Sequence, residues 1–106
     1  MSALPSWWEG AEKRVPESLD DLHGPAEGVV DLPIEVAWSG LTSFDVSDPR
    51  LRLSMYHLVI AVGRRVDVER FLCAEHVRND WPLLRRLIPR PLCRIWEERF
   101  PTLVQS

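Results

Sequence analysis

Residues 49–62 read PRLRLSMYHLVIAV, and this stretch predicts the principal helix of the 106-residue chain. Asp48 can cap the start of the helix, and Pro49 suits the first helical position, where no backbone donor is needed. Gly63 predicts a left-handed stop at the other end. Two apolar stripes cover most of the circumference, so the helix needs packing partners on two sides. The fold is therefore expected to be mainly α.

The residues that follow predict shorter helices. Asp67 can cap a helix over residues 68–73, and residues 74–81 are expected to add a further turn or two. A separate helical segment is expected to begin at Pro82, because proline inside a helix removes a hydrogen bond and clashes with the preceding turn. A last helix is predicted over residues 92–99. Together these segments predict a small body of three or four helices.

The pattern changes upstream of the principal helix. Ile34, Val36 and Trp38 alternate with more polar residues, which is typical of a half-buried strand. Gly40 breaks this pattern, and residues 44–46 can form a second strand. One or two short strands cannot stabilise themselves, so they are expected to lie on the helical body or to extend a partner's sheet.

These patterns divide the chain into two parts. Residues 33–106 are expected to form the small, mainly helical domain. Residues 1–32 predict an acidic, partly disordered arm with a short helix near residues 7–14. Charge is also divided: two basic and nine acidic side chains in residues 1–46 give −7, and eleven arginines with seven acidic side chains in residues 47–106 give +4. The two values sum to the −3 of the whole chain.

Several classes of protein are disfavoured by the composition. No apolar run approaches the ~20 residues of a membrane span, and a signal-peptide pattern is absent, so a cytoplasmic location is expected. Cys73 and Cys93 predict two buried thiols. Cys73 and His76 form one close pair of ligand types, whereas a structural zinc site usually needs two pairs, so no metal is expected. The chain carries no nucleophile or phosphate-loop motif, and neither a catalytic residue nor a cofactor is predicted.

Aromatic residues are the first candidates for binding a partner, because tryptophan is enriched at the energetic centres of interfaces. The chain has five tryptophans, and the adjacent pair in the predicted arm would favour aggregation unless it docked on a surface. The interpretation favours a binding protein rather than an enzyme. Packing inside the core is an alternative for the aromatic residues of the predicted domain. The candidate anchors are Trp7, Trp8, Trp38, Phe44, Tyr56 and Trp96, of which Trp38, Tyr56 and Trp96 have this alternative.

The arginines of the C-terminal part are a second set of candidates. They are compatible with a DNA-binding regulator, which is the alternative function, but Pro82, Pro89 and Pro91 leave no long recognition helix. A solvated face and an acidic protein partner are the other interpretations, and a homodimer through the principal helix is a further alternative. The candidate nucleic-acid contacts are Arg78, Arg85, Arg86, Arg90 and Arg94.

Residues scattered along the chain also match, in type and order, those of a known group of small proteins. They are Leu19-Asp20-Asp21-Leu22-His23-Gly24-Pro25, Gly28-Val29-Val30-Asp31-Leu32-Pro33, Trp38-Ser39-Gly40, Phe44-Asp45, Asp48-Pro49, Arg52, Tyr56, Asp67, Phe71, Trp81, Leu84, Pro89, Arg94, Trp96-Glu97 and Phe100-Pro101. In these positions the sequence resembles small actinobacterial proteins encoded beside nucleotidyltransferase toxins of the abortive-infection type. The resemblance covers residues 18–103 and does not include Trp7 and Trp8.

The resemblance implies a non-enzymatic antitoxin of a type II-like toxin–antitoxin pair. Such a protein would bind the toxin directly and block, distort or silence its active site. The toxins are similar to polymerase-β-type nucleotidyltransferases, which use Mg²⁺ and a nucleoside triphosphate to add nucleotides to RNA. An acidic segment would fit a basic nucleotide- or RNA-binding cleft of such a partner.

Overall fold

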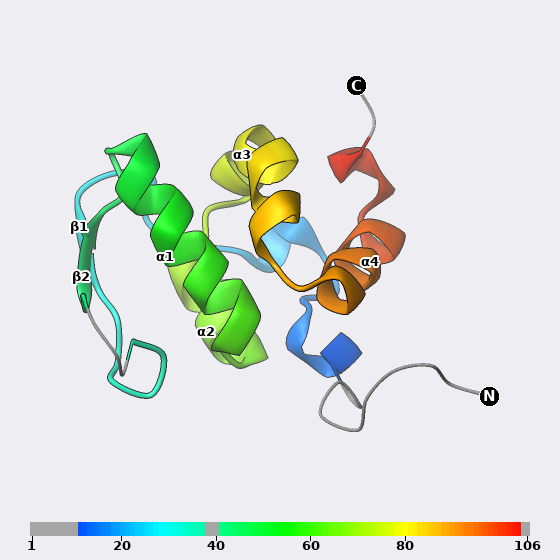
Figure 1. Cartoon of the computed structure of the whole chain (residues 1–106), viewed down its shortest axis with the longest axis horizontal. Helices are drawn as coiled ribbons and strands as arrows, with labels where there is room; N and C mark the ends of the chain where they lie inside the picture. Colours follow the sequence, from blue (N-terminus) through cyan, green and yellow to red (C-terminus); the bar gives the residue numbers. More distant parts are fainter. Residues whose placement is uncertain (1–10, 38–40, 105–106) are drawn as a thin grey trace.

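A computed structural model describes residues 11–37 and 41–104 of the chain. In this part, four α-helices pack with a two-stranded antiparallel sheet, which confirms the mainly α fold with short strands (Figure 1). The helices are α1 (Pro49–Val62), α2 (Arg65–Phe71), α3 (Ala74–Leu87) and α4 (Arg90–Arg99); the strands are β1 (Val29–Asp31) and β2 (Ser43–Asp45); and short 3₁₀ helices span Ala11–Arg14, Leu19–Asp21 and Pro101–Leu103.

The principal helix α1 begins and ends at the predicted residues. The Asp48 carboxylate accepts a hydrogen bond from the backbone N–H of Arg50 at 2.9 Å. Met55, Tyr56 and Val59 are buried, and α2, α3 and β2 all pack against the helix. Most of both apolar stripes is therefore covered within the chain, although Val62 at the end of the helix is exposed, and their breadth alone does not argue for a homodimer.

Gly63 ends α1 for a different reason from the predicted one. Its φ is −76°, so the backbone is not left-handed, and that prediction is wrong. A Cβ at this position would lie 2.5 Å from the Val59 carbonyl oxygen and 3.2 Å from the Asp67 Cβ. Glycine is needed here mainly because a Cβ would collide with the last turn of α1 itself, and the first turn of α2 adds a second close contact.

Asp67 lies inside α2 rather than before it. The helix begins at Arg65, and the Asp67 carboxylate accepts from the backbone N–H of Arg64 at 2.9 Å. The carboxylate thus reaches back from the third helical position to the residue before the helix, as in a capping box. The predicted helix start at Val68, with Asp67 as its cap, is therefore three residues too late.

Pro82 does not break α3, contrary to the prediction. The helix continues through it to Leu87, and Trp81 and Leu84 are completely buried on its inner side. Pro82 itself is exposed, so water can satisfy the carbonyl of Arg78 that loses its helical partner. Burial of the inner face outweighs the local cost of the proline.

The predicted strand at residues 34–38 is wrong in its described part. The backbone N–H groups of Val36 and Ala37 both donate to the Pro33 carbonyl, at 3.0 and 3.1 Å, and close a turn. Val36 and Ala37 are both buried, whereas Ile34 is exposed, so burial does not alternate as in a strand. Trp38 lies outside the described residues.

The sheet instead pairs β1 with β2, and β2 matches the second predicted strand. Val30 lies opposite Phe44, and both side chains face the core. Val29 and Asp31, on either side of Val30, are exposed. The sheet is therefore half-buried, with an inner apolar face on α1 and an outer face in solvent (Figure 1).

The hydrophobic core begins inside the segment that the sequence predicts as an arm. The guanidinium of Arg99 donates to the carbonyl oxygens of Glu12 and Val15, at 3.2 and 2.9 Å, and ties this segment to α4. The 3₁₀ helix Ala11–Arg14 matches the end of the predicted helix over residues 7–14, and residues 1–10 lie outside the description. Residues 11–32 thus belong to the folded domain, and the buried side chains they add to the common core are Val15, Leu19, Leu22, Val30 and Leu32.

Candidate functional site

Three of the six candidate anchors are core residues. Phe44, Tyr56 and Trp96 are 5%, 0% and 1% exposed, so none presents a surface to a partner in this conformation. For Tyr56 and Trp96, packing inside the core is the alternative that the sequence left open. For Phe44 it corrects the prediction, because its pairing with Val30 turns it towards α1. Trp7, Trp8 and Trp38 lie outside the described residues.

Tyr56 stabilises the start of α3. Its hydroxyl oxygen accepts a hydrogen bond from the backbone N–H of Cys73 at 2.9 Å, and its ring meets the edge of the His76 ring. Burial raises the pKa of Tyr56 above its ordinary value, with a smaller opposing effect from the Cys73 hydrogen bond. Cys73 is half-buried, which corrects the expectation of a buried thiol there, whereas Cys93 is buried as predicted.

Trp96 forms an aromatic stack with Trp81 and Phe100, with ring centroids 5.8 and 5.5 Å from its own. Trp81 also donates through its indole N–H to the Glu97 carboxylate at 2.9 Å. This stack fixes α4 against α3. It therefore sets the distance between the arginines that the two helices carry.

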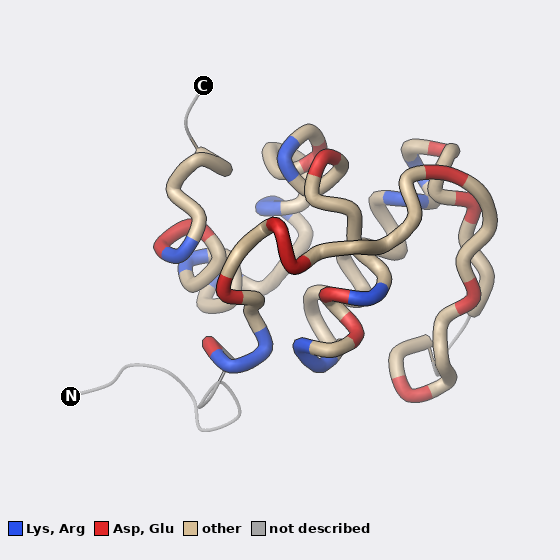
Figure 2. Tube along the Cα trace, turned by 180° about the vertical axis from the view of Figure 1, so that it is seen from behind, with Lys and Arg blue, Asp and Glu red and all other residues tan. Residues whose placement is uncertain are grey.

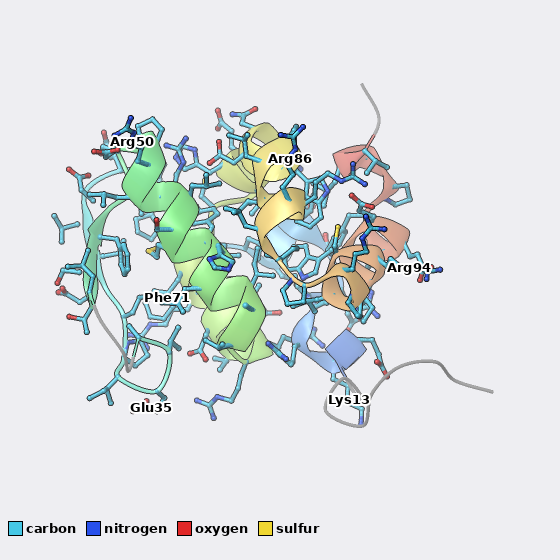
Figure 3. All side chains as sticks on the ribbon, viewed as in Figure 1. Lys13, Glu35, Arg50, Phe71, Arg86 and Arg94 are labelled. Carbon is cyan, nitrogen blue, oxygen red and sulfur yellow. The ribbon has the colours of Figure 1, made fainter. Side chains whose placement is uncertain are left out.

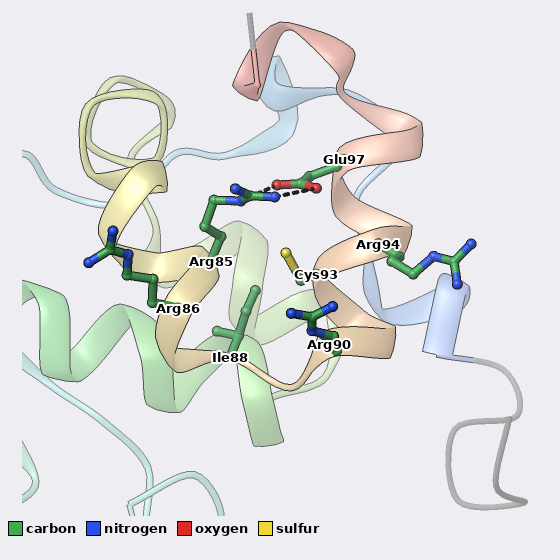
Figure 4. A pocket seen from close by; sticks show the side chains of 7 residues that line it. All are labelled: Arg85, Arg86, Ile88, Arg90, Cys93, Arg94 and Glu97. Carbon is green, nitrogen blue, oxygen red and sulfur yellow. Dashed lines mark hydrogen bonds and ion pairs between the residues drawn. The ribbon is translucent and has the colours of Figure 1, made fainter.

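Four of the five candidate arginines gather around one hollow between the end of α3 and the start of α4 (Figure 4). The hollow has a volume of about 460 Å³. Figure 4 shows Arg85 and Arg90 directed into the space between the two helices, whereas the guanidinium groups of Arg86 and Arg94 point outward on its two opposite sides. We call this the arginine hollow, and it is lined by Arg85, Arg86, Ile88, Arg90, Cys93, Arg94 and Glu97.

The corner between the two helices explains how the hollow forms. Ile88 is buried and fixes the corner, and Pro89 precedes α4. Pro91 lies in the first turn of α4, where the missing N–H has no helical partner to lose. The prolines that the sequence presents as breaks therefore bring the two arginine-bearing helix ends together.

The charges in the hollow are unbalanced. Arg85 donates twice to the Glu97 carboxylate, at 2.8 and 3.4 Å. Arg86, Arg90 and Arg94 are exposed, and none forms an ion pair with a described residue. Four arginines and one glutamate give the lining a formal charge of +3.

The pKa values of the half-buried Glu97 and the buried Cys93 are shifted in opposite directions. Burial alone would raise the pKa of Glu97, but hydrogen bonds from Trp81 and Arg85 outweigh it, so the pKa is lowered. Burial raises the pKa of the Cys93 thiol. At neutral pH Glu97 is therefore an ionised anchor for Arg85, and Cys93 adds no charge.

Arg78 lies outside the arginine hollow. It lines a neighbouring hollow of about 400 Å³ together with Trp81, Pro82 and the C-terminal residues 102–104. Arg85 lines both hollows, so the two adjoin along α3. The candidate nucleic-acid contacts thus form one group of four, with the fifth beside it.

A second exposed feature lies at the sheet. Val29 and Ile34 are each 69% exposed, and Leu41 is 61% exposed. Asp31 and Glu35 are exposed between them in the sequence, and acidic residues recur along this part of the trace (Figure 2). We call these five residues the hairpin surface. The sequence analysis missed it, because Ile34 was placed on the inner face of a predicted strand.

Other arginines hold the chain together, and the sequence analysis did not identify their roles. Arg52 forms an ion pair with Asp80 at 2.7 Å and also donates to the Val46 carbonyl at 3.1 Å, which joins α1, α3 and the end of β2. Arg14 donates to carbonyls at the end of α1. Apart from Val46, their partners are distant in sequence, so no local pattern indicates these contacts.

Among the described residues, no group of three or more His, Cys, Asp or Glu side chains could hold a metal ion. The Nε2 atom of His76 lies 2.8 Å from the Ala26 carbonyl oxygen. None of the helices in residues 11–37 and 41–104 combines the length and apolar character needed to cross a bilayer.

Comparisons of the chain with protein-family models, curated proteins and solved structures give no match.

Proposed function

We propose that this chain is a non-enzymatic antitoxin that binds a nucleotidyltransferase toxin through the hairpin surface. The observation that carries the proposal is the exposure of Val29, Ile34 and Leu41, with the exposed Asp31 and Glu35 close to them in the sequence. Exposed apolar residues rimmed by charged ones are typical of protein-binding sites. The resemblance described above supplies the kind of partner.

Charge supports the choice of partner. An enzyme that binds nucleoside triphosphates and RNA needs a basic cleft to hold their phosphates. The exposed carboxylates of Asp31 and Glu35 complement such a cleft, whereas the arginines of α3 and α4 would repel it. The complex would form in the cytoplasm, where the toxin acts on RNA. Trp7, Trp8 and Trp38 remain candidate anchors for the same partner.

The double variant Ile34→Ser/Leu41→Ser tests the hairpin surface. Removing both apolar contacts should weaken binding to the toxin by about 2 kcal/mol or more, as for interface hot spots. The matched control is Leu83→Ser/Leu87→Ser, which changes two exposed leucines on α3. Binding measured by calorimetry should fall only for the hairpin variant. Equal affinity of the two variants for the toxin would contradict the proposal.

A second candidate function is binding of operator DNA. It is favoured by the continuity of α3, which carries Arg78, Arg85 and Arg86 on one unbroken helix. Such binding should weaken steeply with salt, because phosphate contacts release counterions. A shift of the upstream DNA that disappears at raised salt would support it. A salt-independent shift, or none, would remove this candidate.

A further inference from the structure

We propose that the arginine hollow binds a small ligand that carries two or more linked phosphate groups. The inference does not rest on toxin binding, since the hollow and the hairpin surface share no residue. The recognised chemistry is the phosphate chain itself, as in tripolyphosphate or the tail of a nucleoside triphosphate.

The first support is the supply of free donors. Planar guanidinium groups bind phosphate oxygens in pairs of parallel hydrogen bonds. Arg86, Arg90 and Arg94 have no acidic partner among the described residues, so their donors are open to a ligand. With a formal charge of +3 on the lining, a single phosphate would leave part of the charge unneutralised, and a chain of phosphates would not.

The second support is that one side of the hollow is already ordered. Glu97 holds Arg85 through two hydrogen bonds and is itself held by the indole N–H of the buried Trp81. A guanidinium has five N–H donors, so Arg85 keeps others for a ligand. Because its side chain is already fixed, binding costs less conformational entropy than it would at a mobile arginine.

The third support is the shape of the site. Arg85 and Arg90 face one hollow from two helices, with Arg86 and Arg94 at its outer edges, and its volume of about 460 Å³ is that of a small-molecule pocket. None of the described lining residues is aromatic, so the hollow offers no platform on which a base could stack. The site should therefore recognise the phosphates and not discriminate between bases.

Calorimetric titration of the full chain at low ionic strength tests the proposal. Tripolyphosphate, ATP and GTP are expected to bind with similar affinity, and orthophosphate more weakly. Arg90→Gln should weaken tripolyphosphate binding about tenfold, since it removes a charge-assisted contact inside the hollow, and Arg94→Gln, at the outer edge, should weaken it less. The control Arg50→Gln changes an exposed arginine at the far end of α1 and should leave the affinity unchanged (Figure 3). Arg90→Lys should restore only part of the affinity, because lysine keeps the charge but not the paired donors.

Four results would overturn the proposal. Absence of tripolyphosphate binding would remove it, and an equal loss in Arg50→Gln would show attraction to overall charge rather than a site. ATP binding without tripolyphosphate binding would mean that a base is recognised. Duplex DNA that outcompetes tripolyphosphate at equal phosphate concentration would identify a nucleic-acid surface instead. Thermal unfolding of each variant checks folding, and toxin binding by Arg90→Gln separates failure here from failure of the antitoxin function.

Discussion

Glu97 connects the core of the molecule to its arginine hollow. One carboxylate accepts from the buried indole of Trp81 and from the guanidinium of Arg85. Hydrogen bonds to a charged group contribute more than neutral ones, and an unsatisfied buried donor is costly. This residue therefore contributes to stability and to the order of the proposed phosphate site at once.

Glu97→Gln should lower the free energy of unfolding by about 1–3 kcal/mol, because the amide cannot replace the charge-assisted contacts. The matched control is Glu98→Gln, which neutralises the exposed neighbour on the same helix and should have little effect. Chemical denaturation of both variants measures the difference. Equal stabilities would show that the Trp81 and Arg85 contacts do not stabilise the fold.

The same residue predicts a dependence of stability on pH. The pKa of Glu97 in the folded protein is lowered from 4.5, so its contribution is complete above the unfolded value and is lost as the pH falls through the folded pKa. Below pH 4.5 the wild type should therefore lose stability faster than Glu97→Gln. Parallel slopes for the two proteins would contradict the lowered pKa.

At the scale of elements, Arg14 attaches the N-terminal segment to α1. Its guanidinium donates to the carbonyl oxygens of Gly63, Ile60 and Ala61, which are groups that a helix end leaves without helical partners. Burial lowers the pKa of Arg14 from its ordinary value. The side chain thus acts as a C-terminal cap supplied by a distant part of the chain.

Arg14→Ala should reduce the free energy of unfolding by about 1.5–3 kcal/mol and increase amide exchange in residues 11–22. Lys13→Ala is the control, since Lys13 is basic, adjacent and exposed. Hydrogen exchange and denaturation together make the measurement. Similar behaviour of the two variants would show that the observed hydrogen bonds do not hold this segment.

Gly24 fixes the contact between the N-terminal segment and α2. Its N–H donates to the Leu72 carbonyl at 2.8 Å, and a Cβ would lie 2.3 Å from the Phe71 backbone carbon. Gly24→Ala must therefore separate the two segments and should cost about 2 kcal/mol or more. The neighbouring exposed change Ala26→Ser should be nearly neutral in thermal unfolding. An equally small effect of Gly24→Ala would contradict the close approach.

The elements also show where sequence reasoning succeeds and fails. α1 was predictable to the residue because its cap and its stripes are local signals. The continuity of α3 was not, since burial of Trp81 and Leu84 against distant residues outweighs Pro82. At residues 34–37 the alternation predicts a strand, but the chain forms a turn, because the Pro33 carbonyl accepts the hydrogen bonds of Val36 and Ala37.

The candidate site was also predictable only in part from the sequence. The arginines were identifiable from composition, but their convergence depends on a corner built by Ile88 and two prolines. Phe44, Tyr56 and Trp96 lie in the core, because residue type alone does not separate an anchor from a core residue. Phe44 illustrates this, since its strand pairing turns it inward.

At the scale of the whole molecule, the two candidate surfaces lie apart. Figure 3 shows Glu35 at the end that carries the sheet, and Arg86 and Arg94 on the side of α3 and α4. An acidic partner would be repelled by the hairpin surface, and a basic partner would be repelled by the arginine hollow. A partner with one sign of charge is therefore not expected to cover both surfaces. We therefore expect Arg94→Gln to leave toxin binding intact, and Ile34→Ser/Leu41→Ser to leave tripolyphosphate binding intact. Loss of both activities in either variant would contradict two separate surfaces.

The most direct test is co-expression of the chain with the protein encoded beside it, followed by size-exclusion chromatography with light scattering. A stable complex that also relieves growth arrest is expected for the wild type, and its loss for Ile34→Ser/Leu41→Ser. Separate elution of the two wild-type proteins, with no relief of growth arrest, would contradict the antitoxin function.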